Sequence, residues 1–225
     1  MTLKEKPPAK QREVIGEVES FTFTKENLKK AKELMARYPE GRHASAVLPL
    51  LDLAQRQCQG WLPKAALQYV AHFLNMPEIR VWEVVTFYTM FNLKPVGKHF
   101  LQVCTTTPCW LRGAGQLVDL YCKKFGVEIG ETTADGCFTL KEVECLGACV
   151  NAPMVQINDD FFEDLDEATW SALLDDLTAG KVRAPGSAWG RCSSEPWDPT
   201  QKQMQKPTKP PIQKPTTRKK AQKET

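Results

Sequence analysis

The chain has 225 residues, of which 42% are hydrophobic and 25% charged, as is usual for a globular protein with one large domain or two small ones. Its net charge of +3 is unevenly distributed: residues 196–225 carry eight basic and two acidic side chains (+6), which leaves 22 basic and 25 acidic side chains (−3) for the remainder. The basic excess therefore belongs to the C-terminal end and gives no reason to expect nucleic-acid binding.

No run of the sequence approaches the roughly 18 apolar residues that a membrane-spanning helix needs. The first eight residues, MTLKEKPP, lack the apolar centre of a signal peptide and contain an acid that a transit peptide would avoid. We therefore expect a reducing location, either the bacterial cytoplasm or a mitochondrial matrix from which a presequence has been removed. In either compartment eight cysteines are better interpreted as free thiols or metal ligands than as disulfides.

Helical periodicity dominates the first ninety residues. Residues 1–20 are polar and are expected to form a flexible arm. Apolar side chains then recur at helical spacing in four segments, residues 24–38, 45–59, 63–74 and 77–90, which predict a helical bundle over residues 21–93. Thr24 and Ser45 are the expected N-caps of the first two helices, and Pro63 is expected in the first turn of the third.

At Gly97 the period changes from helical to alternating. Strands are predicted at residues 98–104, 137–145 and 154–158, with shorter ones near residues 128–132 and 161–162. One helix is predicted to end at Phe125, and a last helix is predicted to run from the N-cap Asp166 to about Ala179. Residues 94–182 therefore predict a small α/β domain with a helix-covered sheet.

After Val182 the periodicity is lost, and residues 183–225 are expected to form a largely disordered Pro/Lys-rich tail. Trp189 and Trp197 are candidates for docking on the folded body or on a partner. The basic charge is interpreted as a solvated tail, with docking on an acidic subunit surface or on acidic lipid headgroups as the alternative.

Four cysteines in two close pairs form the candidate site. Cys104 and Cys109 form a C-x4-C pair, and Cys145 and Cys149 form a C-x3-C pair after a gap of 35 residues. Each pair follows an apolar, strand-like run, so that two thiolates from each loop suit one iron each of a [2Fe–2S] cluster. A tetrahedral structural zinc ion is the second interpretation, and disulfides are the third.

The residues around the cysteines suit such a centre. Thr105, Thr106 and Thr107 offer hydroxyls and amides for hydrogen bonds to sulfur, and Gly147 permits a backbone conformation that other residues resist. Among the remaining cysteines, Cys58 and Cys122 are expected to be small buried hydrophobes, Cys192 stands alone, and Cys137 is an alternative ligand that spacing does not exclude.

Nucleotide-binding motifs are missing from the sequence, which contains neither G-x-G-x-x-G after a strand nor G-x-x-x-x-G-K-[ST]. No pair of histidines has the spacing of a Rieske centre, and no C-x-x-C pair suggests a redox dithiol. The chain is therefore not expected to bind NAD or flavin itself. A one-electron centre without a nucleotide site needs a partner with a two-electron cofactor.

The segments VCTTTPC (103–109) and ECLGACVNAPM (144–154), with PEIRVWEVVTFY (77–88) before them, resemble a known family. They are similar to the thioredoxin-like [2Fe–2S] subunit of respiratory complex I, the proton-translocating NADH:quinone oxidoreductase. The resemblance covers about residues 20–182 and leaves out the Lys/Pro tail.

This resemblance implies an α+β protein, a helical bundle followed by a thioredoxin-like [2Fe–2S] ferredoxin domain. One cluster would be held by Cys104 and Cys109 on one iron and by Cys145 and Cys149 on the other, and no residue is predicted to be catalytic. The family also implies a cis peptide bond between Ala152 and Pro153.

The expected partners are the flavin- and NADH-binding subunit, which carries FMN and NADH, and other subunits of the peripheral arm. The expected location is the cytoplasmic face of the bacterial inner membrane, reached through the complex. Equivalent subunits serve soluble NAD-linked hydrogenases and formate dehydrogenases. A zinc-stabilised interaction module and a free-standing ferredoxin are the alternatives from other classes.

Overall fold

The structure, a computed structural model, describes residues 18–192 and 194. These residues form two compact units: residues 18–103 and 121–142 belong to the first, and residues 104–120, 143–192 and 194 to the second. The predictions for most of the N-terminal arm and for the tail beyond residue 194, including Trp197, lie outside the described residues. No helix among the described residues is long and apolar enough to cross a membrane.

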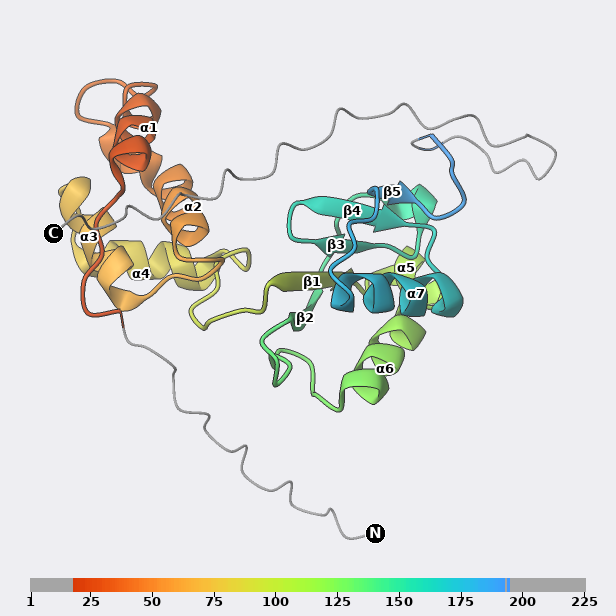
Figure 1. Cartoon of the computed structure of the whole chain (residues 1–225). Coiled ribbons are helices and arrows are strands. Elements are labelled where there is room, and N and C mark those ends of the chain that lie inside the picture. Colours follow the sequence, from red (N-terminus) through yellow and green to blue (C-terminus); the bar gives the residue numbers. More distant parts are fainter. Residues whose placement is uncertain (1–17, 193, 195–225) are drawn as a thin grey trace, which may run out of the picture. The chain divides into compact units, whose positions relative to one another are not determined.

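Four α-helices gather in the first unit (Figure 1): α1 (Lys25–Met35), α2 (Val47–Gln57), α3 (Lys64–Phe73) and α4 (Glu78–Phe87). They form because their apolar side chains recur at helical spacing and are buried together, in a core that includes Ala31, Leu50, Leu51, Leu67, Val70, Val81 and Val85. Thr24 caps α1 as predicted, its side chain accepting a hydrogen bond from the backbone amide of Asn27.

Two helix starts differ from the prediction. Ser45 is not a cap, because residues His43–Ala46 form a 3-10 turn, η1, and α2 begins only at Val47. Pro63 is the N-cap residue of α3 rather than a member of its first turn. Both differences shift a boundary by one or two residues and leave the helix itself in place.

Five strands form one mixed sheet in the order β2-β1-β3-β4-β5. The strands are β1 (His99–Cys104), β2 (Phe138–Val143), β3 (Val155–Ile157), β4 (Asp160–Glu163) and β5 (Gly186–Ser187). β3 and β4 are antiparallel, with Gln156 opposite Phe161, and β4 and β5 are parallel, with Phe162 opposite Gly186. Of the short strand predicted at residues 128–132, only an isolated bridge between Thr132 and Thr139 is present.

The second unit contains α5 (Thr107–Leu111), η2 (Cys149–Asn151) and α7 (Glu167–Thr178), together with the beginning of α6 (Ala114–Phe125). The helix predicted after the first cysteine loop, with its apolar face from Ala114 to Phe125, is present as α6; α5, which contains Cys109, was not predicted, and Gly113 with a φ of +97° lies between the two. Asp166 caps α7 in a reciprocal capping box with Thr169, as predicted.

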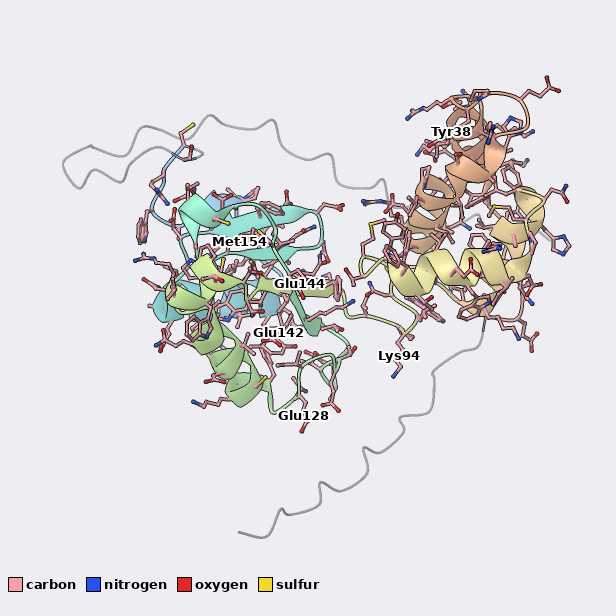
Figure 2. The ribbon with its side chains drawn as sticks, turned by 180° about the vertical axis from the view of Figure 1, so that it is seen from behind. Tyr38, Lys94, Glu128, Glu142, Glu144 and Met154 are labelled. Atoms are coloured by element: carbon pink, nitrogen blue, oxygen red, sulfur yellow. The ribbon has the colours of Figure 1, made fainter. Side chains whose placement is uncertain are left out.

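Buried apolar side chains close the second unit around α7. Trp170 is fully buried, and its indole Nε1 donates a hydrogen bond of 3.0 Å to the carbonyl oxygen of Leu117. Met154, labelled in Figure 2, is also fully buried. By contrast Glu144, which immediately precedes the second cysteine pair, is exposed (Figure 2).

Candidate metal centre

The first cysteine pair lies where β1 passes into α5. Cys104 is the last residue of β1, and Cys109 lies in α5, after Thr106 at the N-cap position and Pro108 in the first turn. Both thiols are almost fully buried, at 2% and 1% exposure. Regular secondary structure on both sides of the loop therefore fixes where these two sulfur atoms lie.

The second pair lies on an exposed loop after β2. Cys145 and Cys149 are both exposed, and their sulfur atoms are 3.9 Å apart. Between them Gly147 has a φ of +82°, as predicted, and its backbone amide donates to the Cys145 sulfur at 3.4 Å. The loop continues through η2 to the Ala152–Pro153 bond, which is cis as predicted.

The two loops meet at Cys104. The backbone amide of Cys104 donates a hydrogen bond of 3.4 Å to the carbonyl oxygen of Met154, and that of Thr105 donates one of 3.4 Å to the carbonyl oxygen of Val143. The backbone amide of Leu146, from the second loop, also lies close enough to the Cys104 thiol to affect its pKa. Residues more than thirty positions apart in the sequence thus converge on the first cysteine pair.

Hydrogen bonds and burial shift the pKa values of the two buried thiols in opposite directions. Burial raises the pKa of Cys104, but hydrogen bonds from the Leu146 and Thr106 amides and from Cys109 outweigh it, so that this pKa lies below its usual value. Burial and the hydrogen bond to Cys104 raise the pKa of Cys109 to about 12. On the exposed loop, the hydrogen bond with Cys145 raises the pKa of Cys149.

The arrangement of the donors fits a two-iron centre. Two thiolates bonded at about 2.3 Å to one tetrahedral metal lie about 3.8 Å apart, and the Cys145 and Cys149 sulfurs are 3.9 Å apart. Among the described residues, no three His, Cys, Asp or Glu side chains gather as ligands of a single ion. The second pair therefore has the spacing of two ligands of one metal, as a binuclear cluster with two thiolates on each iron requires.

A hydroxyl group beside the first pair is consistent with such a centre. The Thr106 Oγ1 atom is buried and has no hydrogen-bond partner of ordinary length within the described residues. The same side chain nevertheless lies close enough to Cys104 to lower the pKa of that thiol. A buried hydroxyl beside a ligand thiol is the kind of donor that tunes iron–sulfur centres.

The other four cysteines differ in burial and in surroundings. Cys58 and Cys122 were expected to be buried and are only half-buried; Cys58 packs against the helical core, and burial raises its pKa. Cys137 belongs to the first unit, where its backbone amide donates to the Asp135 carboxylate. Cys192 is exposed near the end of the described residues.

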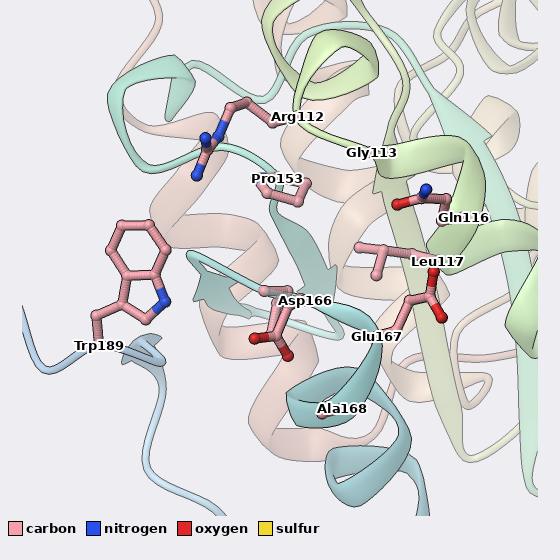
Figure 3. Close-up of a pocket in the computed structure, with 10 residues that line it drawn as sticks. Arg112, Gly113, Gln116, Leu117, Pro153, Asp166, Glu167, Ala168 and Trp189 are labelled. Carbon is pink, nitrogen blue, oxygen red and sulfur yellow. The ribbon is translucent and has the colours of Figure 1, made fainter.

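Two hollows open on the second unit. One, of about 270 Å³, is lined by Thr105, Thr106, Thr107, Trp110 and Glu144, and therefore lies on the first cysteine loop. A larger one, of about 450 Å³, is lined by residues that include Arg112, Pro153, Asp166 and Trp189 (Figure 3). Neither lining contains a cysteine, but the smaller hollow is lined by Thr105, Thr106 and Thr107, which lie between Cys104 and Cys109.

Comparison with known proteins places the chain in a family. The family model described as thioredoxin-like [2Fe–2S] ferredoxin matches residues 31–178, and the chain belongs to this family of iron–sulfur proteins. The match begins within α1 and ends with α7, so it includes all four cysteines of the two loops.

Several curated relatives are highly similar. The chain is 59% identical over 160 residues to an NADH-quinone oxidoreductase subunit of Rickettsia conorii, an alignment that covers 71% of this chain and 96% of the relative. It is 50% identical over 175 residues to the mitochondrial NADH dehydrogenase [ubiquinone] flavoprotein 2 of Dictyostelium discoideum, covering 78% of this chain and 71% of that protein. The predicted relationship to the complex I subunit is confirmed.

A solved structure shares the fold at lower similarity. The crystal structure of an NAD+-reducing [NiFe]-hydrogenase in the air-oxidized state aligns with a TM-score of 0.52 and 24% identity, covering 58% of this chain and 23% of that chain. Together with the family match, this alignment confirms the predicted fold class, a mixed α and β protein with a thioredoxin-like [2Fe–2S] domain.

Proposed function

We propose that the chain is the electron-transfer subunit of a proton-translocating NADH:quinone oxidoreductase and carries one [2Fe–2S] cluster. Cys104 and Cys109 would bind one iron, and Cys145 and Cys149 the other. The observation that carries the proposal is the pair of backbone hydrogen bonds from Cys104 to Met154 and from Thr105 to Val143, each 3.4 Å long, which join the two cysteine loops. It occurs in a chain that is 59% identical to an NADH-quinone oxidoreductase subunit.

The polypeptide's part is to hold and tune the centre. When bound, a [2Fe–2S] cluster accepts and returns one electron at a time. The amides of Leu146 and Thr106 lower the pKa of the Cys104 thiol and so stabilise negative charge on its sulfur. Burial of Cys104 and Cys109 excludes water from one pair, while the exposed loop with Cys145 and Cys149 leaves the other close to the surface.

The exchange of electrons requires a partner subunit. Because the sequence lacks a nucleotide-binding motif, we assign FMN and NADH to a neighbouring subunit of the peripheral arm, and the chain would act only within that complex. The complex would hold it at the cytoplasmic face of the bacterial inner membrane, or at the equivalent matrix face in mitochondria.

Spectroscopy with metal analysis tests the cluster. We expect the purified chain to be coloured, to bleach with dithionite, to give the EPR signal of a reduced [2Fe–2S] centre, and to contain about two irons and two sulfides per chain. A colourless chain with one equivalent of zinc would refute the cluster and favour the alternative of a zinc-stabilised interaction module.

Co-purification tests whether the chain works within a larger NADH-oxidising complex. A tagged chain should retain a flavin-containing protein that oxidises NADH. Recovery of the cluster-loaded chain alone, from cells that express the whole complex, would instead favour a free-standing ferredoxin.

A further inference from the structure

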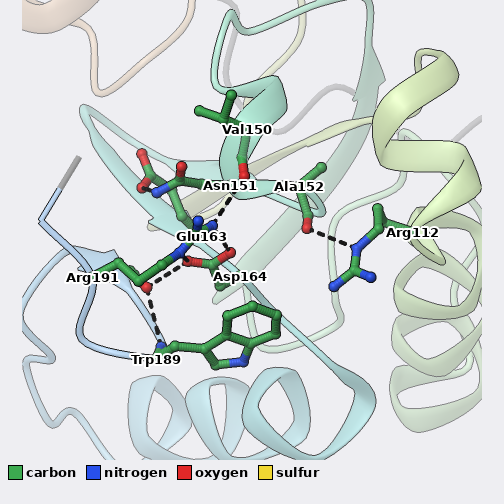
Figure 4. Close-up of polar contacts among 9 residues, drawn as sticks. Arg112, Val150, Asn151, Ala152, Glu163, Asp164, Trp189 and Arg191 are labelled. Carbon is green, nitrogen blue, oxygen red and sulfur yellow. Dashed lines mark hydrogen bonds and ion pairs between the residues drawn. The ribbon is translucent and has the colours of Figure 1, made fainter. Parts of the chain in front are cut away.

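The segment after α7 returns to the second cysteine loop. It forms β5 beside β4 and then places Arg191 against the turn that follows Cys149 (Figure 4). The Arg191 Nη2 atom donates a hydrogen bond of 3.0 Å to the carbonyl oxygen of Val150, the residue next to Cys149. A side chain distant in sequence therefore binds the backbone of this loop directly.

Arg191 is itself held by a buried carboxylate. Its guanidinium binds Asp164 through two hydrogen bonds, one from Nε to Oδ2 at 3.0 Å and one from Nη2 to Oδ1. The Ser187 hydroxyl donates to the same Oδ2 atom at 2.5 Å. The Asp164 side chain is 1% exposed and that of Arg191 is 11% exposed. Burying such a pair is costly unless its hydrogen bonds are satisfied, and here both partners are multiply bonded.

The carbonyl groups of three successive residues after Cys149 accept hydrogen bonds from outside the turn. Besides the bond to Val150, the backbone amide of Asp164 donates to the carbonyl of Asn151 at 2.8 Å. The Arg112 Nε atom approaches the carbonyl of Ala152 at 3.5 Å (Figure 4). The turn carrying Cys149 is thereby fixed by side chains and backbone of the surrounding unit, in addition to the hydrogen bonds of η2 itself.

An aromatic ring connects the two arginines of this arrangement. The guanidinium groups of Arg112 and Arg191 lie 5.8 Å and 5.5 Å from the centre of the Trp189 ring. Ser187, Trp189 and Arg191 all lie beyond residue 178, where the match to the family model ends. The contact with the cysteine loop is thus made by a part of the chain that the family model does not include.

We propose that Arg191 is a positioning residue that clamps the turn after Cys149 and so presents the Cys149 sulfur to the cluster, with Asp164 and Ser187 orienting the guanidinium. The inference rests on the proposed role of Cys149 as a ligand. It assigns to the segment 186–191 a part in retaining the cluster and in setting its reduction potential, because the guanidinium is also a fixed positive charge beside the loop.

The test compares three full-length variants. Arg191→Gln removes the charge and the two-pronged hydrogen bonding, whereas Arg191→Lys keeps the charge alone. Arg183→Gln is the matched control, because Arg183 lies between α7 and β5, close in sequence, but binds Asp176 of α7, at 2.5 Å. The rate of iron release to a chelator and the reduction potential from an EPR-monitored titration are measured for each protein.

We expect iron release to be at least about tenfold faster in Arg191→Gln, because a hydrogen bond from a charged group to the loop is lost. The potential of that variant should be lower than that of the wild type. Arg191→Lys should release iron at an intermediate rate with a potential near the wild-type value, and Arg183→Gln should match the wild type. Equal rates and potentials for Arg191→Gln and Arg183→Gln would overturn the clamp.

A merely structural role for the ion pair is tested by the double variant Asp164→Asn/Arg191→Gln, which removes both charges and avoids an unpaired buried carboxylate. If this folded double variant releases iron faster than the wild type, the result supports the clamp. Release at the wild-type rate contradicts it.

Hydrogen exchange over Cys149–Ala152 in the cluster-free chain gives an independent result. Exchange should be faster in Arg191→Gln than in Arg183→Gln, and equal exchange would refute the clamp. A wild-type chain without any iron–sulfur cluster would refute the proposed function, whereas a normal cluster that is insensitive to Arg191 would refute only this inference.

Discussion

Gly97 precedes the strand that delivers Cys104, and its replacement by alanine should destabilise the fold strongly. A Cβ atom at this position would lie 2.7 Å and 2.8 Å from the backbone C and N atoms of Phe138, and 2.9 Å from the backbone C atom of Cys137. All three distances are well below ordinary contact, and none of the atoms belongs to a side chain that could rotate away. The backbone itself must therefore move.

The cost follows from the hydrogen bonds that such a movement would stretch. The Gly97 amide donates to Thr139 Oγ1 at 2.7 Å, the Lys98 amide to the Gly136 carbonyl at 3.1 Å, and the His99 amide to the Cys137 carbonyl at 2.8 Å. With about 1 kcal/mol for each bond and a similar term for overpacking, we expect Gly97→Ala to lower the free energy of unfolding by about 2–4 kcal/mol.

Urea denaturation followed by circular dichroism measures this difference. Gly115→Ala is the matched control, because a Cβ atom there has no neighbour within 4 Å and the residue lies in α6. This second change should be neutral or stabilising by up to about 1 kcal/mol. A Gly97→Ala variant within about 0.5 kcal/mol of the wild type would refute the close approach of Gly97 to Phe138.

Three further predictions concern the ligands, the N-cap of α7 and the buried indole of Trp170. Cys104→Ser and Cys145→Ser should each lose most of the bound iron while Cys58→Ser keeps it, measured by iron and sulfide analysis; equal losses in all three would mean that the ligands are misassigned. Asp166→Ala removes the N-cap of α7 and should cost about 1 kcal/mol at neutral pH. Hydrogen bonds from the first turn of α7 lower the pKa of Asp166 in the folded chain, so its contribution is fully present above its unfolded pKa of about 3.9 and is lost as the pH falls through the lower folded value. Urea titrations at several pH values should accordingly show wild type and variant converging below about pH 4, and a constant difference would contradict this. Trp170→Phe should cost about 1–3 kcal/mol, because a fully buried indole loses both volume and its hydrogen bond to the backbone of α6, and unchanged thermal unfolding would disprove that bond.

Features that depend on neighbouring residues were predictable from the sequence. Thr24 and Asp166 cap their helices as expected, because an N-cap bonds an amide only two or three residues away. Gly147 has the left-handed conformation that its place between two cysteines indicated. Ser45 failed as a cap because η1 occupies the residues before α2, a local alternative that a polar side chain does not distinguish from a helix start.

Features that depend on distant pairing were not predictable. β5 contains only Gly186 and Ser187, too few residues for any alternation, and it exists because Phe162 and Glu163 of β4 offer a free edge to pair with. The role of Arg191 was hidden for the same reason, since nothing near it in sequence indicates the Asp164 carboxylate or the Val150 carbonyl that it binds. Trp189 was expected to dock, but its arginine neighbours become known only from the structure.

The two halves of the candidate site are therefore built in different ways, and this difference determines where it is vulnerable. Cys104 and Cys109 are buried at the junction of a strand and a helix, so their positions are maintained by the same hydrogen bonds that maintain the fold. Cys145 and Cys149 are exposed on a loop that depends on contacts from elsewhere in the chain. A local opening of residues 145–152 can release one pair of thiols while the rest of the second unit stays folded, because such openings cost less than global unfolding. Loss of the cluster should accordingly begin at the second pair, and contacts such as that of Arg191 should govern its rate more than the stability of the whole chain does.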